Sequence, residues 1–164
     1  MAFQKQVQPY PARGVTGMQA GNNPIAFVLP IPLADEGGVI IGRAAWWSEA
    51  GKVKNTGSGA PLGIVIREKV AVIPCTEEAT MTYIEGQAVP IAIQGDLLLT
   101  STEAVTAGQA LFAKTADGTL VPGTAGGTVS GAVETPWTIT ESAAAGEIFH
   151  ASAWYAKTVE VPSE

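Results

Sequence analysis

The chain has 164 residues and a net charge of −6, with 46% hydrophobic and only 15% charged residues. This balance is typical of a globular protein and excludes a disordered chain, and the length favours one domain. The nine Lys and Arg residues are spread singly, so they do not form the basic patch that nucleic-acid binding requires. The high content of Gly (19) and Pro (11) favours turns and short strands over long helices.

The chain carries no predicted membrane or secretion signal. The first six residues lack the apolar core of a signal peptide, and no run of 18 apolar residues occurs. Cys75 is the only cysteine, so an internal disulfide is excluded and a reducing compartment is favoured. We therefore expect no nucleic-acid partner and no membrane partner.

Residues 1–36 differ in composition from everything that follows. Gln, Gly, Asn and Pro residues interrupt any pattern that would sustain a helix or a central strand. The segment is nevertheless too apolar for a solvated tail, so we expect an extended arm. The arm either folds back over its own domain or reaches onto a neighbouring subunit, and both can hold together. The arm residues that we expect at an interface are Phe3, Tyr10, Met18, Ile25 and Phe27.

A predicted hairpin follows the arm. An apolar run at 39–41 leads into 43–47, and the chain turns through Gly51 to return along 52–55. Gly51 supplies the positive φ that a short hairpin loop often needs. The next strand is predicted within 61–67. Because an isolated hairpin is marginally stable in water, later strands must cover this one.

Two adjacent tryptophans lie at the centre of this hairpin. Neighbouring residues of a strand point to opposite faces, so Trp46 and Trp47 cannot both enter one core. One of them is exposed or is covered by the arm or by another subunit. Exposed aromatic residues often anchor protein interfaces, and we include both tryptophans among the expected interface residues.

The rest of the chain also reads as strands. Asp117-Gly118 lies between two apolar runs and predicts a hairpin, while Pro136 is expected to break 129–140 into a strand pair. One helical turn is expected within 102–109. The predicted strand segments are 70–76, 81–84, 87–100, 110–114, 119–121, 129–140 and 147–156.

These segments predict an all-β protein. About eight to ten short strands, with turns every 8 to 12 residues, are typical of a β-sandwich or a barrel-like domain. We place this single domain at residues 37–158, after the arm at 1–36 and before a polar tail at 159–164.

No constellation of residues predicts catalysis. His150 is the only histidine and Cys75 the only cysteine, so one chain cannot build a four-ligand zinc site of the usual kind. The adjacent acidic pairs at 35–36 and 77–78 are expected in solvated loops, unlike the separated carboxylates of a glycosidase. We expect no catalytic residue, no metal and no cofactor, and hence no enzyme.

The order of features resembles the structural cement, or capsid decoration, proteins of tailed bacteriophages. The resemblance spans most of residues 20–122 and is one of pattern. The segments that carry it are NNP at 22–24, GRAAWW at 42–47, GKVKN at 51–55, PLGIVIRE at 61–68, GD at 95–96 and GQALFA at 108–113.

The resemblance implies a β-rich structural protein of the virion. Such a protein is made in the host bacterial cytoplasm, binds the outer surface of the capsid and stabilises it by bridging neighbouring major capsid proteins. It also implies self-association as a homo-dimer or homo-trimer. Two other classes remain open from the residues alone: a β-barrel enzyme of the dUTPase kind, and a carbohydrate-binding adhesin module of a phage tail or surface, in which tryptophans would stack on sugars.

Overall fold

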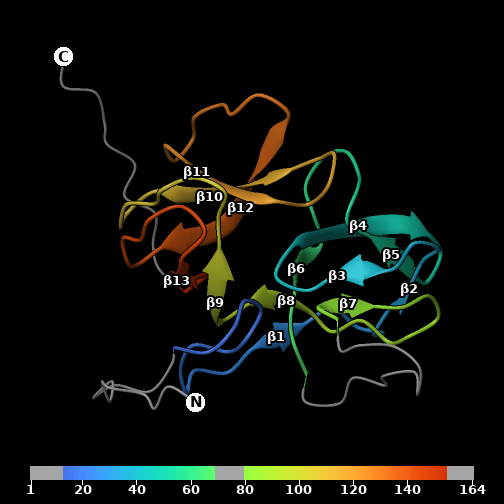
Figure 1. The fold of residues 1–164 in the computed structure, drawn as a ribbon. Coiled ribbons are helices and arrows are strands. Elements are labelled where there is room, and N and C mark those ends of the chain that lie inside the picture. The colour runs from blue at the N-terminus through green and yellow to red at the C-terminus, as the bar shows by residue number, and fades with distance from the viewer. Residues whose placement is uncertain (1–12, 69–79, 155–164) are drawn as a thin grey trace, which may run out of the picture.

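The computed structural model describes residues 13–68 and 80–154. In these residues the chain forms thirteen strands in three sheets and no helix, which confirms the all-β prediction (Figure 1). The count exceeds the predicted eight to ten because four strands, β1, β2, β3 and β7, have only two residues each.

The strands follow one another along the described chain with short connections. Their bounds are β1 Ala26–Phe27, β2 Leu33–Ala34, β3 Val39–Ile40, β4 Ala44–Glu49, β5 Lys52–Lys54, β6 Gly63–Val65, β7 Thr82–Tyr83, β8 Ile91–Gln94, β9 Asp96–Thr100, β10 Ala110–Lys114, β11 Leu120–Gly123, β12 Ala132–Ile139 and β13 Ile148–Ser152.

Six strands form a sheet that closes into a small barrel. Their order is β1-β8-β6-β4-β5-β2, with β2 parallel to β5 and the other pairs antiparallel. The edge of β2 that does not pair with β5 bonds to the segment that precedes β8. Ala34 N donates to Gln87 O and Val89 N donates to Pro32 O, both at 2.8 Å. These bonds join the two ends of the sheet and remove a free edge.

A second sheet of five strands packs beside this barrel. Its order is β11-β10-β12-β13-β9 and every pair is antiparallel. The β10–β11 hairpin forms at the predicted Asp117-Gly118, where Gly118 has a φ of 70°. The two-stranded sheet β3-β7 lies next to the barrel (Figure 1).

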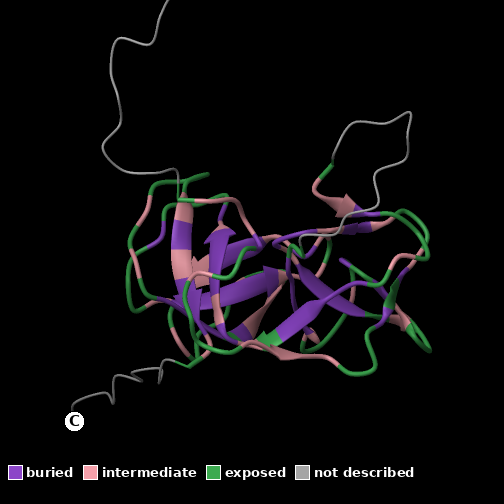
Figure 2. Ribbon diagram, turned by 90° about the horizontal axis from the view of Figure 1, so that it is seen from below, coloured by how far each residue is buried: buried purple, intermediate pink, exposed green. Residues whose placement is uncertain are grey.

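Strand β6 and the first residues of β4 and β8 are buried on both faces. Alternate residues point to opposite sides of a strand, so Ala45, Val65 and Ile91 fill the barrel interior. Their neighbours Ala44, Ile64 and Ala92 face a second core that is shared with the five-stranded sheet. Figure 2 shows the buried residues concentrated in these inner strands and the exposed ones in the peripheral loops.

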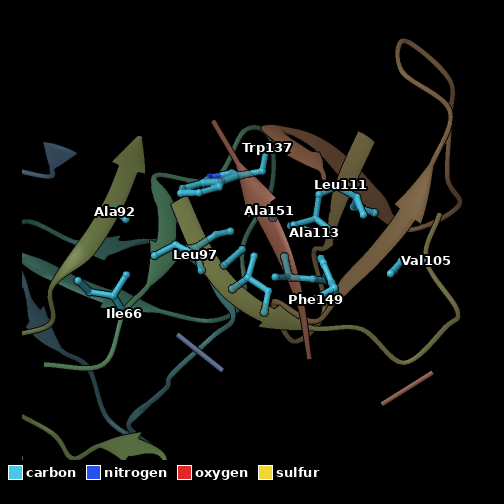
Figure 3. Packing of buried hydrophobic residues seen from close by; sticks show 14 of the residues in the cluster. Ile66, Ala92, Leu97, Val105, Leu111, Ala113, Trp137, Phe149 and Ala151 are labelled. Atoms are coloured by element: carbon cyan, nitrogen blue, oxygen red, sulfur yellow. The ribbon is translucent and has the colours of Figure 1, made fainter. Parts of the chain in front are cut away.

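The shared core contains Trp137, the largest fully buried side chain among the described residues. Trp137 and Phe149 from the five-stranded sheet are both 0% exposed, and Figure 3 shows them clustered with aliphatic side chains of that sheet. Leu97 from β9 lies between this cluster and the barrel strands that carry Ala92 (Figure 3). The three leucines at 97–99 are at most 5% exposed.

The described part of the arm, residues 13–36, lies on its own domain. Residues 17–20 run along the outer edge of β9, with Gly17 N donating to Leu98 O at 2.7 Å and Ala20 N to Asp96 O at 2.9 Å. Further along, the arm contributes β1 and β2 to the barrel, outside the 37–158 range expected for the domain. Two-residue strands have too short a pattern to be recognised in the sequence.

Two expectations about secondary structure are wrong. Residues 102–109 contain no helical turn; Val105 instead forms an isolated β-bridge with Ala143. Residues 129–140 contain one strand, β12 Ala132–Ile139, because Pro136 lies in a bulge where the pairing with β10 jumps from Glu134 to Thr138. No ladder hydrogen bond is required of Pro136 there. The strand expected at 70–76 and the tail at 159–164 lie outside the described residues.

We predict that Gly17→Ala destabilises the fold. Gly17 has a φ of 81°, and a Cβ there would overlap the Ile41 side chain and lie 3.2 Å from Gly42 N. The strain and the clash should lower the free energy of unfolding by about 1–3 kcal/mol. Urea denaturation measures this, with Gly21→Ala as the matched control because a Cβ at Gly21 meets nothing within 4 Å. Equal unfolding midpoints for the two variants would contradict the prediction.

Candidate interaction surface

The two tryptophans of β4 point to opposite faces, as their adjacency requires. Trp46 is 4% exposed, belongs to the shared core, and donates from Nε1 to Gly59 O at 2.9 Å. Trp47 is 45% exposed. Of the two tryptophans, only Trp47 has a side chain exposed enough to contact a partner, because Trp46 is covered by its own chain.

The loop that follows β5 is held against the Trp46 ring. A Cβ at Gly57 would overlap this ring, so the absence of a side chain lets the loop approach closely. The bond from Trp46 Nε1 to Gly59 O holds the same loop at its next turn. These contacts with the buried Trp46 fix the position of the loop, which lines a groove on the surface.

This groove, which we call the Trp47 groove, has a volume of about 370 Å³. Its lining combines the Trp47 ring with small residues of the loop. Among the described residues, Trp47 Nε1 makes no hydrogen bond. The lining residues are Trp46, Trp47, Lys54, Gly57, Ser58, Ala60 and Leu62.

The expected interface residues of the arm do not lie together. Ile25 and Phe27 are half-buried and pack against the shared core of their own chain. Met18 is 38% exposed and lies beside Gly14, over the outer edge of β9. Phe3 and Tyr10 lie outside the described residues. Of the residues singled out in the described arm, only Met18 offers a substantially exposed apolar side chain.

Sequence reasoning missed a second apolar feature within the arm. Leu29, Ile31 and Leu33 are 79%, 47% and 43% exposed. Leu29 lies at a bend and Ile31 and Leu33 follow it in the segment that leads into β2. The backbone of this segment bonds to residues 87–89, which precede β8, and to β5. We call these three residues the apolar edge. The sequence pattern that could have indicated this feature is the alternation of apolar residues with Pro30 and Pro32.

Ionic contacts fasten both ends of the described arm. Arg13 pairs with Glu141 in the β12–β13 loop at 2.6 Å. At the other end, Asp35 N donates to Val53 O at 3.0 Å, and the Asp35 carboxylate lies 3.8 Å from Lys52 Nζ. The Ser48 hydroxyl, the Glu36 N–H and Lys52 lower the pKa of the Asp35 carboxyl. That carboxylate is charged at neutral pH and holds the arm against β5.

A second hollow of about 360 Å³ lies where the arm meets the outer face of the five-stranded sheet. Asp96 accepts a hydrogen bond from the Asn23 side chain, and Ser152 lies directly opposite Asp96 in the β9–β13 ladder. His150 and Trp154, which is 48% exposed, complete this polar hollow.

Known ligand signatures are sparse in the described residues. No group of three or more His, Cys, Asp or Glu side chains comes together there as a metal site. Cys75 and the acidic pair at 77–78 lie outside the described residues. Residues 13–68 and 80–154 also contain no helix that is long and apolar enough to span a membrane.

Comparison with known proteins identifies the class of this chain. The model of the structural cement protein family (E217 gp24/Pam3 gp6) matches residues 3–152. The chain belongs to this family. It is therefore a phage structural protein of the cement class.

The fold has a counterpart among solved structures. A chain of "The capsid of Myoviridae Phage XM1" is 19% identical to this chain, with a TM-score of 0.61, and the alignment covers 93% of this chain and 98% of that chain. The likeness shows a shared fold over nearly the whole length. A search of the curated proteins found no match.

We predict that the two tryptophans differ sharply when each is truncated. Trp46→Ala should lower the free energy of unfolding by about 3–5 kcal/mol, because it empties part of the shared core. Trp47→Ala should lower it far less, since the ring is 45% exposed. Chemical denaturation of both variants measures the difference. A larger loss for Trp47→Ala would contradict the assignment of Trp46 to the core.

Proposed function

We propose that this protein binds the outer surface of a phage capsid and stabilises it by bridging neighbouring major capsid proteins. The match of the cement family over residues 3–152 carries this proposal. We further propose that the protein acts without catalysis and self-associates as a dimer or a trimer. If many copies each contact two shell subunits, their individually modest contacts add up to a strong stabilisation of the shell.

The apolar edge supports this role because it offers a contact suited to a protein partner. Leu29, at 79% exposure, is the most exposed large apolar side chain among the described residues. Ile31 and Leu33 extend the same strip, while the backbone beneath them is fixed to the barrel by Leu33 N donating to Gly51 O at 2.9 Å. A rigid apolar strip binds with a small ordering cost. We assign the major capsid protein as its partner.

We predict that acidic residues on this edge abolish capsid binding. The double variant Leu29→Glu, Ile31→Glu should lose at least tenfold in affinity for undecorated capsids, because charges would be buried in the contact. Its unfolding midpoint should stay close to that of the parent, since both side chains are exposed. Co-sedimentation with capsids measures binding, and Thr102→Glu, an exposed site in the β9–β10 connection, is the matched control.

Two outcomes would contradict these proposals. Failure of the parent protein to bind undecorated capsids, with no symmetric density in electron cryo-microscopy of the mixture, would overturn the capsid-binding role. Undiminished binding by the double variant would overturn the apolar edge as the contact and retain the role itself.

A second candidate function, glycan binding by an adhesin module, is favoured by the polar hollow. Asp96, Asn23 and His150 offer hydrogen-bonding groups beside the exposed Trp154 ring, which is a combination suited to polar ligands with one apolar face. A glycan screen tests this candidate. Binding that disappears in Trp154→Ala would support it, and a blank screen would remove it.

A further inference from the structure

Three segments of the chain meet at β2, where the apolar edge ends. On one side Leu33 N donates to Gly51 O in the β4–β5 turn, and on the other side Gly86 N, in the turn after β7, donates to Ala34 O, both at 2.9 Å. Figure 1 shows β2, β5 and β7 on the same side of the molecule. The two turns are therefore fixed in position relative to the apolar edge.

The turn after β7 is itself rigid and carries a further exposed apolar side chain. Gln87 N donates to Ile84 O at 3.1 Å, and the Gln87 side-chain oxygen accepts from Ile84 N at 3.0 Å. The Ile84 side chain is 41% exposed. The fold thus adds a fourth exposed aliphatic side chain, in a segment that bonds to β2.

Carboxylates are in excess over ammonium groups around this apolar surface. Lys52 and Lys54 of β5 are the two cations that act on these carboxylates. Four carboxylates against two ammonium groups leave an excess of two negative charges. We call the four carboxylates, which follow β2 or lie in the segments bonded to it, the acidic border; they belong to Asp35, Glu36, Glu49 and Glu85.

Two members of the acidic border are matched within the chain and two are available to a partner. The Lys52 ammonium lies 2.8 Å from the Glu49 carboxylate and 3.8 Å from that of Asp35. Glu36 and Glu85 are exposed, and within residues 13–68 and 80–154 neither carboxylate forms a hydrogen bond or an ion pair. A cation of a partner can therefore bind either of them without displacing an internal contact.

A surface of this composition selects its partner by charge. The exposed aliphatic side chains provide contact area, while the unmatched carboxylates attract basic surfaces and repel acidic ones. Lys and Arg side chains combine a long apolar stem with a cationic end, and Arg forms bidentate pairs with carboxylates. Such side chains can cover the aliphatic groups with their stems and reach the carboxylates with their charged ends.

We propose that the apolar edge and its acidic border dock onto a basic surface of the major capsid protein. Lys or Arg side chains of the shell pair with Glu36 and Glu85, and Leu29, Ile31 and Leu33 pack against apolar groups between them. The inference rests on the capsid-binding role proposed above and deepens it, because it states the chemistry of the partner surface.

Charge reversal tests this proposal in the full-length protein. Glu36→Lys and Glu85→Lys should each weaken binding to undecorated capsids about tenfold in about 0.1 M NaCl, because each replaces an attraction with a repulsion. Co-sedimentation measures binding. Glu103→Lys is the matched control, since Glu103 is also exposed but lies in the β9–β10 connection, residues 101–109, where no large apolar side chain is exposed.

Salt dependence separates a charge effect from damage to the fold. The distance over which exposed charges act falls from about 10 Å in 0.1 M salt to about 3 Å in 1 M salt. In about 1 M NaCl the parent should bind more weakly, and its difference from Glu36→Lys and Glu85→Lys should shrink to less than about twofold. The unfolding midpoints of both variants should stay close to that of the parent, because both side chains are exposed.

Each outcome bears on a different part of the proposal. Equal capsid binding by Glu36→Lys, Glu85→Lys and Glu103→Lys would overturn the basic partner surface and retain the capsid role. If sedimentation equilibrium shows weaker self-association of the first two variants while their capsid binding is unchanged, the acidic border faces a second copy and the assignment to the shell is wrong. A parent protein that binds no capsids at either salt concentration overturns the capsid role and this inference together.

Discussion

The burial on both faces of strand β6 and of the first residues of β4 and β8 is the constraint on which the rest of this structure depends. One face closes the barrel interior and the other packs against the five-stranded sheet. Strands that are covered twice must carry apolar residues at consecutive positions, and small ones where backbones approach. At Gly63, even a Cβ would overlap the Ala92 carbonyl. The barrel and the second sheet are therefore held together by shared strands.

Gly17 also links the five-stranded sheet to the barrel, at the outer edge of β9. Its N–H bonds to Leu98 of the five-stranded sheet and its carbonyl accepts from Arg67 just beyond β6, at 2.7 and 2.8 Å. The described arm is thus part of the framework. A rigid framework with apolar features at its perimeter suits a protein whose role is contact, because little ordering is needed when those features bind.

Much of the architecture was predictable because the residues that define it act locally. Gly51 and Asp117-Gly118 select their turns whatever surrounds them, and both hairpins form where predicted. The prediction at Pro136 was wrong, because Pro136 lies in a bulge of the β10–β12 pairing, where no hydrogen bond from its nitrogen is needed. The interface residues were harder to predict. Ile25 and Phe27 are as apolar as Leu29 and Ile31, and the neighbours that cover the first pair and leave the second exposed come from distant strands.

The sequence by itself determined the all-β class, the positions of the principal hairpins and the opposite orientation of Trp46 and Trp47. These follow from backbone preferences and from the two-residue period of a strand. Only the tertiary structure decided which tryptophan is buried, how the arm joins the barrel, and that Leu29, Ile31 and Leu33 form an exposed edge. The reason is physical: a two-residue pattern in the sequence shows that the two faces of a strand differ, whereas long-range packing decides what covers each face.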